Sequence, residues 1–237
     1  MLLNININYL ANLRNTIGEG EPDIIKFARY CEHSGANGIV AYYSTLSNML
    51  STYDIKNLKR HLKSRFILKI AMNEPSLQLA LDTKPDVVCI VQDTKEFSPS
   101  IGFNAFRNSV QLKEFIKPIK EKGILASVFI EPEIEQVHAA YKAGMNYVEL
   151  NTMNYSKNFQ SNHHNDEFIK LKEATILANT LGLQVSLCKN INYKNIKDLL
   201  KIPSINEITI GHGIISKSIY MGIDNSIKEI KAIFNEK

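Results

Sequence analysis

The chain has 237 residues, of which 44% are hydrophobic and 22% charged, and its formal net charge is +4. Such a chain can bury a sizeable core, and its basic residues are interleaved with acidic ones, which excludes a long basic surface for nucleic acid. No apolar stretch reaches the roughly 18 residues of a membrane span, and the first residues lack the basic region of a secretory signal. We therefore expect one cytoplasmic domain over residues 1–237 that binds neither nucleic acid nor membrane.

The cysteines carry no sign of a structural bridge or a metal site. Cys31, Cys89 and Cys188 are odd in number and unrelated in spacing, and none belongs to a C-x-x-C pair. A disulfide framework or a zinc site would need such spacing. The sequence therefore predicts free thiols in a reducing compartment and no metal.

Short apolar, β-branched runs recur along the chain, each followed by a longer amphipathic stretch. In chain order, the predicted strands are residues 2–7, 38–43, 66–72, 86–91, 124–130, 147–150, 183–187 and 207–210. Helical patterns between them begin at Pro, Asp or Glu, and several end at Gly, as in 22–35, 132–144 and 166–182. Eight such units predict an α/β fold, a (β/α)8 TIM barrel, with an open doubly wound sheet as the alternative.

In a (β/α)8 barrel, the functional side chains lie at the carboxyl ends of the strands. The segment Gly211-His212-Gly213 follows the last predicted strand and precedes a helix. Glycines let a ligand approach the backbone closely, and a helix start offers free N–H groups and a positive dipole to an anion. This segment predicts a phosphate site, and the alternative is an ordinary turn beside a structural histidine.

Two lysines at predicted strand ends could act chemically. The alternation in residues 66–72 places Lys69 inside the barrel, where Glu149 is its best partner. A buried lysine with a depressed pKa could form a Schiff base, whereas a paired or outward-facing lysine would be structural. Lys189, beside Cys188, could hold an anion or act as a nucleophile, or it could be an ordinary loop lysine.

Two predicted loops are long for this architecture, residues 92–106 and 152–165. The second contains His163 and His164, and adjacent histidines point in different directions, which disfavours a shared metal ion. We expect both loops to be lids or plain surface.

Segments spread over almost the whole chain resemble the pyridoxine 5′-phosphate synthase family, which closes the ring in one route to vitamin B6. They are NINYLANLRN, EPDIIKFARYCEHSGANGI, TKPDVVCIV, SVFIEPEIEQVHAAYKAG, YVELNT, LGLQV and ITIGHGIISKSIYMGI. The resemblance implies a barrel with extra helices, usually an octamer. It implies condensation of 1-deoxyxylulose 5-phosphate with 3-amino-2-oxopropyl phosphate, releasing phosphate and water without a metal or organic cofactor.

Three features of the family's site are kept. The asparagine that binds the amino ketone phosphate matches Asn6, the glycine-histidine phosphate turn matches Gly211-His212, and the glutamate of the sixth strand matches Glu149. The resemblance therefore implies that small phosphorylated substrates, or inorganic phosphate, bind at Asn6, Gly211 and His212.

Several binding positions of the family are substituted. The Asp-His pair after the first strand is Asn8-Tyr9, and the arginine beyond Arg14 is Ile17. The arginine and histidine for the sugar phosphate are Ser44 and Met49, and the Thr-Glu-Gly-Gly loop is residues 100–103. We keep Asn8, Tyr9, Ser44 and Asn190 as candidate substrate- or phosphate-binding residues.

The proton-transfer positions are also substituted. The family's catalytic histidine after the second strand is Tyr42, and its catalytic glutamate of the third strand is Lys69. The Gly-His-Gly after the seventh strand, whose histidine donates a proton, is Cys188-Lys189-Asn190. Losing one positioned acid or base typically costs about 10²- to 10⁴-fold in rate.

Three functions are compatible with this pattern. In the first, the chain is a working synthase in which Tyr42, Lys69 and Lys189 take the acid and base roles beside Glu149. In the second, favoured by the residue chemistry, it is a divergent copy that keeps a phosphate-binding barrel with impaired or lost synthase activity. In the third, it is a lysine-dependent, aldolase-like enzyme acting on a phosphorylated carbonyl compound.

Overall fold

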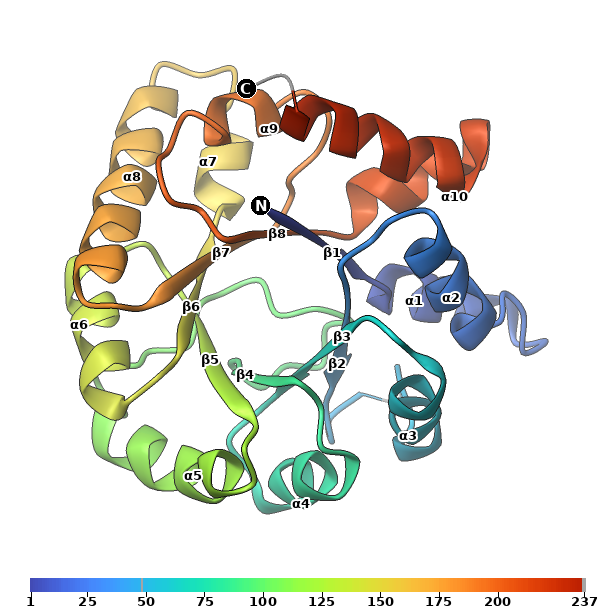
Figure 1. Ribbon diagram of the computed structural model, residues 1–237, viewed down its shortest axis with the longest axis horizontal. Coiled ribbons are helices and arrows are strands. Elements are labelled where there is room, and N and C mark those ends of the chain that lie inside the picture. Colours follow the sequence, from blue (N-terminus) through green and yellow to red (C-terminus); the bar gives the residue numbers. More distant parts are fainter. Residues whose placement is uncertain (48, 236–237) are drawn as a thin grey trace.

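The computed structural model, which describes residues 1–47 and 49–235, has a closed barrel of eight parallel strands at its centre (Figure 1). Each strand pairs with its neighbours in chain order, and the first also pairs with the last. The strands are β1 Leu2–Asn6, β2 Gly38–Tyr43, β3 Arg65–Ile70, β4 Val87–Ile90, β5 Leu125–Ile130, β6 Tyr147–Asn151, β7 Gln184–Cys188 and β8 Glu207–Ile210. The (β/α)8 barrel is confirmed, and the open sheet is excluded because β1 and β8 are hydrogen-bonded.

Helices surround the barrel, lying in the connections between successive strands and after the last strand (Figure 1). They are α1 Asn8–Ile17, α2 Ile24–His33, α3 Thr52–His61, α4 Glu74–Thr83, α5 Ser109–Glu121, α6 Ile134–Ala143, α7 Met153–Lys157, α8 His164–Thr180, α9 Ile196–Leu199 and α10 His212–Asn235. The predicted helical segments 22–35, 132–144 and 166–182 form α2, α6 and α8. Two helices follow β1 and two follow β6, so the barrel carries the extra helices that the family resemblance implied.

The period-2 pattern of each strand divides its side chains between two cores. In β3, Phe66 and Leu68 pack against the helix layer, whereas Ile67 and Lys69 point into the barrel. The apolar residues inside the barrel form a separate cluster, consisting of Val40, Tyr42, Ile67, Val87, Cys89, Val91, Phe129 and Cys188. The three cysteines are free and buried.

A polar network fills the amino-terminal end of the barrel. Arg65 forms an ion pair with Glu207, and the guanidinium carbon of Arg65 lies 5.0 Å from the ring centroid of Tyr147. The side-chain nitrogen of Asn4 donates to the other carboxylate oxygen of Glu207 at 2.7 Å. These side chains fill the lumen at the amino-terminal end of the barrel.

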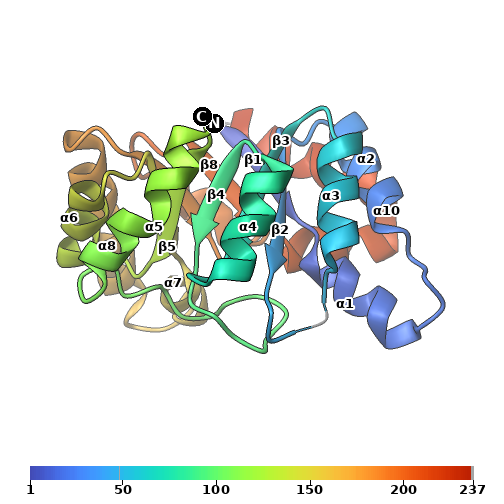
Figure 2. The same cartoon turned by 90° about the horizontal axis from the view of Figure 1, so that it is seen from below.

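The β4–α5 connection lies at the carboxyl end of the barrel, opposite the chain termini (Figure 2). The carboxylate of Glu131 accepts hydrogen bonds from the Gly102 backbone N–H at 2.8 Å and from the Asn151 amide at 2.7 Å. These bonds fix the connection to the ends of β5 and β6. The predicted loop 92–106 is therefore an irregular segment held to the barrel by hydrogen bonds. The prediction of a plain loop over residues 152–165 was wrong, because this segment contains the helix α7.

Among the described residues, no helix combines the length and the apolarity needed to cross a membrane.

Candidate functional site

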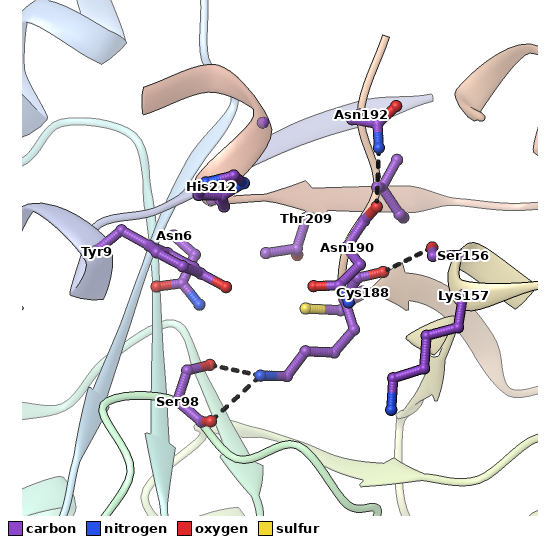
Figure 3. A pocket seen from close by; sticks show the side chains of 14 residues that line it. Asn6, Tyr9, Ser98, Ser156, Lys157, Cys188, Asn190, Asn192, Thr209 and His212 are labelled. Carbon is purple, nitrogen blue, oxygen red and sulfur yellow. Dashed lines mark hydrogen bonds between the residues drawn. The ribbon is translucent and has the colours of Figure 1, made fainter. Parts of the chain in front are cut away.

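A cavity of about 400 Å³ opens at the carboxyl end of the barrel, between the ends of β1, β7 and β8 and the helix α7 (Figure 3). Its lining residues are Asn6, Tyr9, Ser98, Ser156, Lys157, Cys188, Lys189, Asn190, Ile191, Asn192, Thr209, Gly211, His212 and Gly213. Of the predicted site residues, the structure thus brings together Asn6, Tyr9, Lys189, Asn190, Gly211 and His212.

The turn from β8 into α10 forms one wall of this cavity. Helix α10 begins at His212, and the first N–H groups of a helix have no acceptor within the helix. A Cβ atom on Gly211 would lie 2.8 Å from the ring of Tyr9, so only glycine lets the ring pack here. The glycine that the sequence pattern assigned to ligand approach therefore also provides space for an aromatic side chain.

Tyr9 joins this wall to the β4–α5 connection. Its ring centroid lies 5.6 Å from that of His212 and 4.8 Å from that of Phe97, which meets it edge-on. Burial raises the pKa of Tyr9, so its hydroxyl stays protonated at neutral pH. Beside it, Asn6 accepts a hydrogen bond from the Asn8 backbone N–H at 2.9 Å, which fixes the orientation of its side-chain amide.

Lys189 lines the cavity at the end of β7 and is 8% exposed. Its Nζ atom donates to Ser98 Oγ at 2.9 Å and lies 3.2 Å from the Ser98 carbonyl oxygen (Figure 3). Burial, together with the nearby charge of Lys69, lowers the pKa of Lys189 to about 8. In the described part of the chain, Lys189 forms no ion pair, although the more distant carboxylates of Glu149 and Glu96 partly offset the effect of burial on its pKa.

Lys69 is in a different environment. Its Nζ atom forms an ion pair with the carboxylate of Glu149 inside the barrel and lies 3.6 Å from Cys188 Sγ. Lys69 is 2% exposed and Glu149 is 3% exposed, so water does not screen the pair. Burial alone would lower the pKa of Lys69, but the Cys188 sulfur and the Glu149 carboxylate more than offset it and raise the pKa.

The expected pairing of Lys69 with Glu149 is therefore confirmed. Of the alternatives for Lys69, the structure agrees with the structural ion pair and not with a Schiff-base lysine of depressed pKa. Because the carboxylate holds the proton on Lys69, this amine is no nucleophile at neutral pH. Burial raises the pKa of Cys188 to about 11, so the neighbouring thiol is protonated too.

Tyr42 and Ser44 face the β4–α5 connection and do not line the cavity. The Ser44 hydroxyl donates to the Asp93 carboxylate at 2.9 Å, and the Tyr42 hydroxyl lies 3.3 Å from the same oxygen. Burial raises the pKa of Tyr42. The Asp93 carboxylate gives this corner a negative charge where the resembling family has an arginine and a histidine for the sugar phosphate.

Asn8 also lies outside the cavity, although the sequence placed it among the binding residues. Its side chain accepts from the Tyr42 backbone N–H at 2.8 Å and donates to the Tyr42 carbonyl oxygen at 3.1 Å. Both polar atoms are thus used to connect α1 to β2.

Sequence reasoning missed several cavity residues, chiefly Lys157, Ser98, Ser156, Asn192 and Thr209. Thr209 could have been found from the sequence, because the alternation of β8 points it inward together with Glu207. In the structure, its buried Oγ1 has no hydrogen-bond partner among the described residues. Lys157 could not, because it lies on α7 within a stretch interpreted as a loop.

His163 and His164 are not part of the cavity. His164 Nε2 lies 3.6 Å from an Asp198 carboxylate oxygen, and its ring packs against that of Tyr155 at 5.0 Å. Within residues 1–47 and 49–235, no group of three or more His, Cys, Asp or Glu side chains is placed to hold a metal ion.

A closed barrel with a polar cavity at the carboxyl ends of its strands defines a (β/α)8-barrel protein with a pocket for a small molecule. Solved structures of this class superpose over the whole chain. KGPDC from Streptococcus mutans has a TM-score of 0.69 at 11% identity, covering 99% of this chain and 97% of its own. Phosphoribosyl anthranilate isomerase from Thermus thermophilus has a TM-score of 0.62 at 10% identity, covering 100% and 99%. At these identities, the likeness shows the fold alone.

The sequence of the whole chain identifies the family. Residues 3–236 match the family described as pyridoxal phosphate biosynthesis protein PdxJ. The pyridoxine 5′-phosphate synthase of Chlorobium phaeobacteroides is 36% identical over 97% of this chain and 98% of its own. That of Prochlorococcus marinus strain MIT 9312 is 32% identical over 98% and 97%. The chain belongs to this pyridoxine 5′-phosphate synthase family.

Proposed function

We propose that this chain is a divergent member of the family that binds a small phosphorylated ligand in the cavity and has lost most of its ring-closing activity. One observation carries the proposal: the family's carboxylate position in the third strand is Lys69, which forms a buried ion pair with Glu149.

Support for phosphate binding comes from the charge of the cavity. The lysines Lys157 and Lys189 line it, and the start of α10 lies in its wall. Among the described residues that line it, none is acidic. Positive side chains, a glycine turn and helix-start N–H groups together favour a dianionic phosphate.

The residues at the proton-transfer positions, in contrast, do not favour ring closure. Ring closure requires several proton transfers, and the resemblance assigns them to a glutamate at position 69 and to histidines at 42 and 189. Here the first position is the cation of an ion pair, and Tyr42 is a neutral phenol hydrogen-bonded beside Asp93. Each lost acid or base costs about 10²- to 10⁴-fold, so two or three losses remove most of the rate.

A second candidate function, a working synthase with substituted residues, is favoured by Lys189 alone. It stands at the position of the family's proton donor, and its pKa of about 8 suits proton transfer near neutral pH. This candidate requires Lys189 to act without the glutamate and the other histidine.

Calorimetric titration of the purified protein with 3-amino-2-oxopropyl phosphate, pyridoxine 5′-phosphate and inorganic phosphate tests the binding half. We expect at least one of these ligands to bind, and Asn6→Ala and His212→Ala to weaken its binding at least tenfold. His138→Ala, which changes an exposed histidine on α6, is the matched control and should leave binding unchanged.

The condensation assay on the same preparation tests whether the ring-closing activity is lost. Binding without product supports the proposal, and product at a rate comparable to the relatives supports the working synthase. If none of the three compounds binds, the phosphate pocket itself is wrong.

A further inference from the structure

Lys69 and Lys189, both at the carboxyl end of the barrel, differ in the groups that surround their side-chain amines. Lys69 is paired with Glu149, and the cavity residue that it contacts by a hydrogen bond is Cys188. Lys189 lines the cavity, and its Nζ atom contacts only the neutral oxygens of Ser98 among the hydrogen-bond partners in the described chain. A buried amine that forms no ion pair loses its proton more readily than an exposed one and is then nucleophilic.

We infer that Lys189 forms an imine with the carbonyl carbon of a small phosphorylated ketone or aldehyde bound in this cavity. The inference rests on the proposed phosphate pocket and adds to it the chemical class of the ligand and the atom that reacts. In this arrangement, the turn at Gly211-His212 holds the phosphate, and Nζ of Lys189 meets the carbonyl group.

The placement of the groups suits such a ligand. Lys189 lies at the end of β7, and Gly211 and His212 follow the adjacent strand β8, so both line the same cavity from neighbouring strands. Ser98 belongs to the β4–α5 connection, so its hydrogen bonds with Lys189 join the amine at the end of β7 to this connection. A cavity of about 400 Å³ accepts a compound of this size.

The step balances without any further reactant. The unprotonated Nζ attacks the carbonyl carbon, forming a C–N bond and a tetrahedral carbinolamine. The carbonyl oxygen then leaves as water together with the two hydrogens of the amine, and the C=N bond forms. A solvent proton on the imine nitrogen restores the positive charge of Lys189. No oxidation or reduction takes place.

The protonation state of Lys189 agrees with this role. A pKa of about 8 leaves roughly a tenth of the amine unprotonated at pH 7, against less than about one in a thousand for an ordinary lysine.

Borohydride trapping tests the inference directly. The protein is incubated with dihydroxyacetone phosphate and sodium borohydride, and the modified lysine is located by peptide mass spectrometry. We expect one adduct, on Lys189, and at least tenfold less adduct with dihydroxyacetone, which lacks the phosphate. Inorganic phosphate should compete with the labelling.

Three variants separate the reacting lysine from its surroundings. Lys189→Arg keeps the charge and should abolish the adduct, while Lys194→Arg, an exposed lysine in the same connection, should leave it unchanged. His212→Ala keeps Lys189 and should reduce trapping about tenfold. Thermal unfolding of each variant checks that the barrel is intact.

The outcomes are distinguishable from those of the proposed function. Phosphate binding by calorimetry with no adduct on Lys189 overturns the imine and leaves the phosphate pocket standing. Absence of both overturns both. Labelling that persists in Lys189→Arg, or that spreads over surface lysines, also overturns the inference.

Discussion

The backbone of Lys189 has a φ of +99°, in the left-handed half of conformational space that side chains other than glycine rarely adopt. The family's pattern has glycines on either side of this position, and this chain has Cys188 and Asn190 there instead. An unfavourable backbone conformation and a desolvated amine at the same residue both oppose folding. Such costs are typical of a residue that serves a site rather than the fold.

Replacing Lys189 with methionine is expected to stabilise the protein at neutral pH. The folded-state pKa of about 8 lies below the ordinary 10.5, so between these values the unfolded chain binds more protons. The cost of burying the charge is thus fully present below pH 8 and fades as the pH rises toward 10.5. Urea unfolding should give Lys189→Met roughly 1–3 kcal/mol more stability at pH 7 and a smaller gain at pH 10. An equal gain at both pH values would contradict the assigned pKa.

Anion binding should depend on the charge of the same amine. Sulfate is a suitable probe, because its charge is constant between pH 6 and 10. A bound dianion stabilises the protonated form of Lys189, so affinity should be highest below pH 8 and fall about tenfold as the pH rises through this value. Calorimetric titrations across this range, with Lys189→Met as the comparison, check the effect. A fall of the same size in the variant would assign the dependence to another group.

The ion pair between Lys69 on β3 and Glu149 on β6 should make the stability of the barrel sensitive to either residue. Lys69→Met would leave the Glu149 carboxylate buried without a partner, which typically costs about 3–5 kcal/mol. The double variant Lys69→Met/Glu149→Leu should recover most of that loss, because the buried charge is removed as well.

Chemical denaturation of the single and double variants measures this coupling. Lys228→Ala on α10, which breaks an exposed pair with Asp224, is the control and should change the stability far less than Lys69→Met does. A Lys69→Met variant as stable as the parent would show that the ion pair is not formed in solution.

The strands and most helices could be predicted from the sequence because alternation and helix-end residues are local signals. The inward direction of Lys69 and its pairing with Glu149 followed from the same alternation and from the cost of an isolated buried charge. The roles of Asn8 and Lys157 could not be predicted. The first depends on a long-range contact with β2, and the second on a short helix inside a polar stretch.

The contacts that hold the barrel together are spread over the whole molecule. Its apolar layers lie between strands and helices and in the lumen, and its amino-terminal end is filled by the Arg65–Glu207 network. The apolar clusters include some of the substituted positions, among them Tyr42 and Cys188 in the lumen and Met49 against the helix layer, and the Lys69–Glu149 pair involves a further one. The closed (β/α)8 barrel thus forms in a chain that is 36% identical to the Chlorobium phaeobacteroides synthase.

The family resemblance implies a homo-oligomer, usually an octamer, and we propose an assembly of this kind for the chain. Ile219 and Tyr220 on α10 are 75% and 87% exposed, a degree of exposure that favours association for neighbouring large apolar side chains. Light scattering after size-exclusion chromatography should give a mass several times 26.8 kDa, and Ile219→Lys/Tyr220→Lys should lower it. A parent protein that runs as a monomer at micromolar concentration would contradict the proposal.

The most direct measurement is the formation of pyridoxine 5′-phosphate from 1-deoxyxylulose 5-phosphate and 3-amino-2-oxopropyl phosphate by the unmodified protein at saturating concentrations, beside the Chlorobium phaeobacteroides relative. The loss of the positioned acids and bases predicts a rate at least about 10⁴-fold below that of the relative. A rate within about tenfold of the relative would contradict the account, and would show that Lys189 or its neighbours have taken over proton transfer.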